Sequence, residues 1–144
     1  MGQHPEKKRE KFAKNHRPRF LAEVSQRIRE GESSGFAIHE FLDEYYAALL
    51  ADRPSFLAQC PDSVALPDPW NTQVIDAYLS AVAEALSYYD KFPAPRWVFA
   101  DRFFLRDPWF ASSIEGMKPL LLMESPVFFR RRNLFVSRNA LSRA

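Results

Sequence analysis

Glycine and cysteine are scarce in this sequence of 144 residues, and both shortages exclude classes of protein. The four glycines, Gly2, Gly31, Gly35 and Gly116, form neither a GxGxxG nor a GxxxxGK motif. A phosphate-binding loop of the common nucleotide-binding kinds is therefore not expected. The single cysteine, Cys60, cannot form an intramolecular disulfide.

Long apolar runs are also missing. The longest strongly apolar run, Leu120 to Met123, is far too short to cross a bilayer. Residues 1–19 are basic and polar, so they do not have the composition of a secretory signal. We therefore expect a cytoplasmic protein without a membrane span.

Residues that could carry catalysis or bind a metal are few. His39 and Asp43 are spaced so that both project from one side of a helix, but a catalytic metal needs about three protein ligands. A cysteine nucleophile needs a base beside it, and His39 is the sole histidine outside the basic N-terminal segment. We expect no metal, no cofactor and no enzymatic activity. A metal-dependent hydrolase built on His39, Asp43 and the acids near Asp101 is the weakest of three hypotheses.

The charge changes sign along the chain. Residues 1–19 contain seven Lys or Arg and two acids, and residues 126–144 contain five Arg and no acid. The segment between them, 20–125, contains eight basic and sixteen acidic residues. This order indicates either that the basic ends fold back on the acidic middle or that they bind an acidic partner.

Apolar residues at helical spacing predict an all-α fold, a single compact domain of about five helices over residues 19–144. The expected helices cover 19–30, 36–53, 69–89, 96–104 and 114–125, the last of them broken near Pro119, with shorter helical turns after Pro54, after Pro126 and after Ser137. For 96–100 a strand is the alternative, which we disfavour because no partner strand is evident. Asp107, which precedes a proline, is expected to cap a helix.

The last twenty residues combine basic and bulky apolar side chains. Residues 125–144 hold five arginines, three phenylalanines, no lysine and no acid. Arginine and aromatic residues are enriched at protein interfaces, whereas lysine and glutamate are depleted there. The predicted partner-binding residues are Phe128, Phe129, Arg130, Arg131, Arg132, Phe135 and Arg138. The alternative left open is that this segment packs on the protein's own acidic middle.

Residues 1–18 are expected to form a flexible basic arm. The candidate nucleic-acid contacts are Lys7, Lys8, Arg9, Lys11, Lys14, Arg17 and Arg19. Together these patterns predict a non-enzymatic adaptor or regulator that binds another protein through its C-terminal segment. Antitoxins are one such class, by analogy of size and charge layout. The alternative is a regulator that binds nucleic acid with both basic ends.

Overall fold

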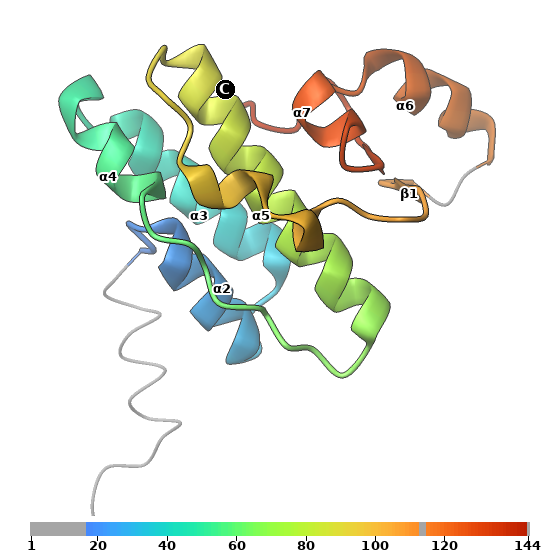
Figure 1. Ribbon diagram of the computed structural model, residues 1–144, viewed down its shortest axis with the longest axis horizontal. Coiled ribbons are helices and arrows are strands. Elements are labelled where there is room, and N and C mark those ends of the chain that lie inside the picture. Colours follow the sequence, from blue (N-terminus) through green and yellow to red (C-terminus); the bar gives the residue numbers. More distant parts are fainter. Residues whose placement is uncertain (1–16, 113–114, 144) are drawn as a thin grey trace, which may run out of the picture.

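The computed structural model describes residues 17–112 and 115–143, with most of the chain in helices (Figure 1). The α-helices are α2 (Leu21–Arg29), α3 (Ser34–Ala47), α4 (Arg53–Leu57), α5 (Pro69–Tyr89), α6 (Lys118–Glu124) and α7 (Val127–Arg130). The 3₁₀ helices are η1 (Leu50–Asp52), η2 (Arg96–Phe99), η3 (Asp101–Phe103) and η4 (Glu115–Met117), and two strands, β1 (Trp109–Phe110) and β2 (Leu134–Phe135), complete the described elements.

Helix α5 crosses the centre of the molecule, and its bounds match the helix predicted over 69–89 (Figure 1). Asp68 caps it by accepting a hydrogen bond from the N–H of Trp70 at 2.9 Å, and Pro69 occupies its first turn. No glycine or proline interrupts it. Residues 79–87 are buried without a break, so the middle of the helix is enclosed on all sides.

Helices α2 and α3 form a pair on one side of α5 (Figure 1). Gly31, with a φ of 107°, turns the chain between them. The hydroxyl of Ser33 then caps α3 by accepting from the N–H of Phe36. The helix predicted over 36–53 ends earlier, at Ala47, because Ala48 and Leu49 adopt extended backbone before the chain re-enters helical turns.

The helix predicted over 96–104 is present as two short 3₁₀ helices, η2 and η3, and the alternative of a strand is wrong. The prediction that Asp107 caps a helix is also wrong, because the chain runs into strand β1 instead. Strand β1 pairs in parallel with β2, with Trp109 opposite Leu134 and Phe110 opposite Phe135. Neither strand is predicted by the sequence, since two residues show no alternating pattern.

The C-terminal part returns to the body of the molecule after α6. The helix predicted over 114–125 with a break or kink near Pro119 is present as η4 and α6, and Pro119 lies in the first turn of α6, where a proline needs no N–H partner. Helix α7 begins after Pro126, as predicted, and packs against α5. The short helix predicted after Ser137 is a set of turns, in which the Ser137 hydroxyl accepts from the N–H of Asn139.

The predicted all-α fold is confirmed, with six α-helices among the described residues instead of about five. Buried apolar side chains of α2, α3, α4, α5, α7 and β2 form one core. The described helices include none with the length and apolar character needed to cross a membrane. The basic arm predicted over 1–18 lies outside the described residues, apart from Arg17 and Pro18.

Candidate binding surface

Arg132 is the largest fully buried side chain among the described residues, although it stands in a run of three arginines. Its guanidinium donates to the Ser80 hydroxyl at 2.8 Å and to a carboxylate oxygen of Glu84 at 2.7 Å. It also donates to the backbone carbonyls of Phe128 and Val98, each at 2.7 Å. This arginine therefore ties α5, α7 and the end of η2 together inside the core.

Burial and the neighbouring carboxylate have opposite effects on the pKa of Arg132. Burial lowers the pKa of the Arg132 guanidinium, and the Glu84 carboxylate counteracts part of that shift. The ring of Phe104 lies 4.6 Å from the guanidinium carbon. A second arginine, Arg131, reaches the other oxygen of Glu84 at 3.0 Å from the solvent side. A buried charge is tolerated here because each nitrogen of the Arg132 guanidinium has a hydrogen-bond partner.

The predicted partner-binding residues thus divide into two groups. The side chains of Phe128, Phe129, Arg132 and Phe135 are buried, so they face the protein's own core, the alternative that the sequence left open. The remaining three, Arg130, Arg131 and Arg138, are exposed, and for them partner binding stays a prediction.

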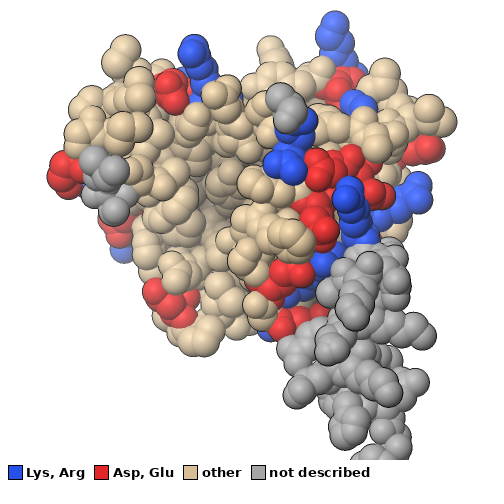
Figure 2. All heavy atoms as spheres, turned by 180° about the vertical axis from the view of Figure 1, so that it is seen from behind, with Lys and Arg blue, Asp and Glu red and all other residues tan. Residues whose placement is uncertain are grey.

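Both basic ends also meet the acidic face of α3. Arg17 approaches Glu44 at 3.7 Å, and Arg143 binds both carboxylate oxygens of Asp43, at 2.8 and 3.2 Å. Figure 2 shows acidic and basic side chains intermingled in one band on this face of the molecule. The first of the two explanations for the charge order therefore holds for these arginines.

Of the predicted nucleic-acid contacts, only Arg17 and Arg19 belong to the described residues. Arg17 is paired with Glu44, and the guanidinium of Arg19 lies 5.3 Å from the centre of the Phe56 ring. Lys7, Lys8, Arg9, Lys11 and Lys14 lie outside the part of the chain that the structure describes. Nucleic-acid binding therefore stays a prediction.

The contact between the C-terminus and α3 can be tested through the acidity of Asp43. The Arg143 guanidinium lowers the pKa of this carboxyl, so the ion pair contributes stability above the ordinary value near 3.8 and loses it as the pH falls through the lowered value. We expect Arg143→Ala to raise the pKa of Asp43. An NMR pH titration of the Asp43 carboxyl carbon measures this change. Arg138→Ala is the control and should leave that pKa unchanged; equal pKa values in all three proteins would contradict the contact.

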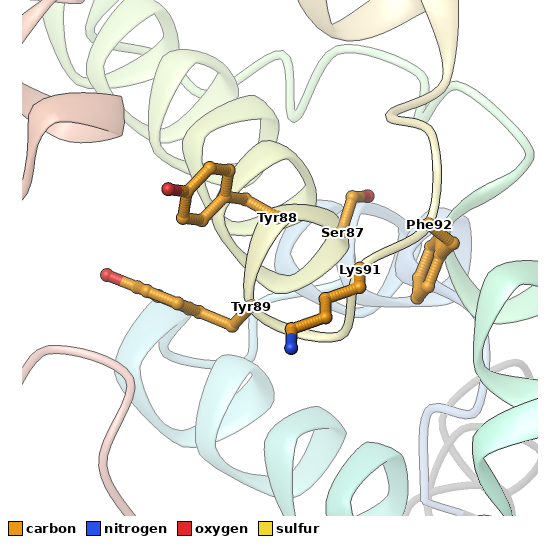
Figure 3. A pocket seen from close by; sticks show the side chains of 5 residues that line it. All are labelled: Ser87, Tyr88, Tyr89, Lys91 and Phe92. Carbon is orange, nitrogen blue, oxygen red and sulfur yellow. The ribbon is translucent and has the colours of Figure 1, made fainter.

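Two neighbouring tyrosines at the end of α5 remain exposed. Tyr88 is 68% and Tyr89 is 55% exposed, and their rings project side by side, away from Phe92 (Figure 3). The buried ring of Phe128 supports both, with ring centres 5.2 and 5.7 Å away. The guanidinium of Arg131 lies 5.9 Å from the centre of the same ring.

A cavity of about 520 Å³ opens beside these rings, lined by Ser87, Tyr88, Tyr89, Lys91 and Phe92 (Figure 3). Lys91 has a φ of 63°, a left-handed backbone that ends α5 and turns the chain back. We call Tyr88, Tyr89, Lys91 and Arg131 the tyrosine surface. The patterns described above do not predict this surface. Two tyrosines in a row before a helix breaker nevertheless give a signal, because neighbouring residues at a helix end, 100° apart around the axis, cannot both face the core.

The acidic side chains near the end of α5 are engaged in ion pairs. Asp90 accepts from the Tyr45 hydroxyl at 2.6 Å and from Arg53 at 3.1 Å, and Glu84 is held by two arginines. Lys91 has no ion-pair partner among the described residues. The tyrosine surface therefore presents aromatic rings and positive charge together.

Other sites of chemistry are not evident in the described part of the chain. There, no three His, Cys, Asp or Glu side chains lie close enough together to hold a metal ion, and His39 has no such companions. Comparison with protein-family models, with curated proteins and with solved structures found no match for this chain. The function has to be inferred from the residues themselves.

Proposed function

We propose that this protein is a non-enzymatic adaptor or regulator that binds another protein through the tyrosine surface. The observation that carries the proposal is the pair Tyr88 and Tyr89, two large aromatic side chains that stay mostly in solvent although a buried ring holds them in place. Exposed aromatic side chains on a rigid support are the usual anchors of protein interfaces.

The support of the two rings matters for affinity. A tyrosine has only two side-chain torsions to fix, and contact with the Phe128 ring restricts them before any partner arrives. The entropy lost on binding is then small for the apolar area that becomes buried. Phe128 thus takes part in binding by positioning the tyrosines, while its own side chain remains in the core.

The charge of the surface indicates the chemistry of the partner. Lys91 lies beside the tyrosines, and Arg131, which is paired with Glu84, lies against the Phe128 ring that supports them. Such a surface fits a protein segment that presents apolar and acidic side chains together. Antitoxins act in this way, by covering a partner without chemistry, and an antitoxin-like role in the cytoplasm is the specific form of the proposal.

Single-stranded nucleic acid would use aromatic rings and cations in the same manner. A protein partner is favoured because affinity for nucleic acid depends on many phosphate contacts, and the tyrosine surface has only two basic side chains. Arg17, one of the predicted nucleic-acid contacts, is moreover paired with Glu44. Nucleic acid is therefore an outcome that the experiment must distinguish.

Site-specific photo-crosslinking in the native cell tests the proposal. A photoreactive phenylalanine replaces Tyr89 in one variant, and Phe36 or Phe99, exposed aromatic residues of α3 and η2, in two matched controls. We expect one protein to be crosslinked at position 89 and not at 36 or 99. Crosslinks to nucleic acid at 89, or the same products at all three positions, would contradict the proposal.

A further inference from the structure

A second, smaller cavity of about 210 Å³ lies along the first half of α5. It is lined by Ser34, Gly35, Ile38 and His39 of α3, by Val74, Ile75 and Tyr78 of α5, and by Trp109 of β1. Three separate elements thus contribute its walls. The face of the molecule that carries α3 is visibly hollowed among uncharged side chains (Figure 2).

Four polar side chains that line this cavity have no hydrogen-bond partner among the described residues. The hydroxyls of Ser34 and Tyr78, the imidazole of His39 and the indole N–H of Trp109 make no hydrogen bond to any other described residue. The polar atoms of Ser34, Tyr78 and Trp109 are not among the buried ones, and His39 is exposed, so all four groups are open to a ligand from solvent. A mostly apolar lining with a few polar groups is typical of a ligand site.

The kind of group that fits follows from the donors. An indole N–H can only donate, and a hydroxyl or a neutral imidazole can also donate. Burial raises the pKa of Tyr78, so its hydroxyl keeps the proton that it would donate. The residues that line the cavity thus include up to four donors, and the acids nearest along α3, Glu40 and Asp43, are bound by arginines.

The apolar walls and the volume define the rest of the ligand. Ile38, Val74 and Ile75 provide an aliphatic lining. The space exceeds the roughly 150 Å³ of an apolar cavity that accepts benzene, and it is below the usual range for a drug-sized molecule, about 300–1,000 Å³. One aromatic ring with a short acidic arm matches this size.

We propose that the cavity of Tyr78, His39 and Trp109 binds an aromatic carboxylate, with the carboxylate at the donors and the ring against the isoleucines and Val74. The same chemistry has two sources, a free aromatic acid or the C-terminal carboxylate of a peptide that ends in an aromatic residue. The cavity shares no lining residue with the tyrosine surface, which lies at the C-terminal end of α5.

The test is a titration of ¹⁵N-labelled protein followed by NMR. The ligands are phenylacetate, the neutral 2-phenylethanol, and a short peptide ending in phenylalanine whose C-terminus is either a free carboxylate or an amide. We expect phenylacetate or the free-acid peptide to shift the signals of Gly35, His39 and the Trp109 indole. The tighter of the two identifies the source. The neutral alcohol and the amidated peptide should bind about tenfold more weakly, since they cannot supply a charged acceptor.

Tyr78→Phe keeps the ring and its contact with Phe129, and removes only one donor. We expect it to weaken phenylacetate binding about tenfold. Tyr46→Phe, which removes a hydroxyl outside the cavity, is the matched control and should bind as the unmodified protein does. If Tyr78→Phe melts at a lower temperature, His39→Ala provides the same test with an exposed side chain. No shift at the cavity with either acid, or equal binding of acid and alcohol, would overturn the proposal.

Discussion

Replacing Arg132 by alanine is expected to lower the free energy of unfolding by about 3–5 kcal/mol, a large part of the total stability of a domain this size. The change removes donors from two backbone carbonyls and from Ser80, and it leaves Glu84 with only the exposed Arg131. It also leaves a void where the largest buried side chain stood. Denaturant unfolding followed by circular dichroism measures the loss.

The neighbouring Arg130 provides the matched control. It is exposed, and its side chain has no partner among the described residues, so Arg130→Ala should change the stability by less than about 0.5 kcal/mol. Glu84→Ala should also be strongly destabilising. Because the two charges share one network, the double variant should lose less than the sum of the two single losses. Equal unfolding curves for Arg130→Ala and Arg132→Ala would refute the buried network.

The second large effect is expected at Phe129. Its side chain is fully buried, and its ring meets that of Tyr78 edge to face at 5.0 Å. Removing a buried phenylalanine costs about 3–5 kcal/mol, because the apolar contact is lost and a cavity remains. We therefore expect Phe129→Ala to destabilise the fold, as measured by the denaturant midpoint.

Val127, two residues earlier on α7, is the control for this prediction because it is 45% exposed. Val127→Ala should shift the midpoint little, by less than about 0.5 kcal/mol. If instead Phe129→Ala were as stable as the unmodified protein and lost only a binding activity, the phenylalanine would belong to an interface, and its place in the core would be wrong.

Sequence patterns predict this fold where local chemistry is strong. Helix α5 begins and ends as predicted because a cap, a proline and a long uninterrupted apolar pattern all agree. The end of α3 is missed, since Ala48 and Leu49 are compatible with a helix and only the chain's path makes them extended. The β1–β2 pair depends on residues far apart in the chain, which a local pattern cannot reveal.

A sequence pattern also cannot predict which side chain in the run of arginines 130–132 is buried. Three identical residues differ only in where the backbone points them: α7 ends at Arg130, and Asn133, with a φ of 63°, then turns the chain toward β2. The buried partners of Arg132 lie on α5 and η2, far away in sequence. Composition alone therefore offers the contact between basic tail and acidic middle as one of two alternatives, and it does not indicate which arginine enters the core.

Binding of a partner protein through the tyrosine surface is tested most directly by a calorimetric titration. The titrant is the partner that the photoreactive residue at position 89 captures. The unmodified protein is compared with Tyr88→Ala/Tyr89→Ala and with Phe36→Ala/Phe99→Ala, after all three are shown to melt alike. Each anchor residue of an interface contributes about 2 kcal/mol, so we predict that the tyrosine variant binds at least about a hundredfold more weakly, while the control keeps its affinity. Equal affinity in all three proteins would contradict the claim.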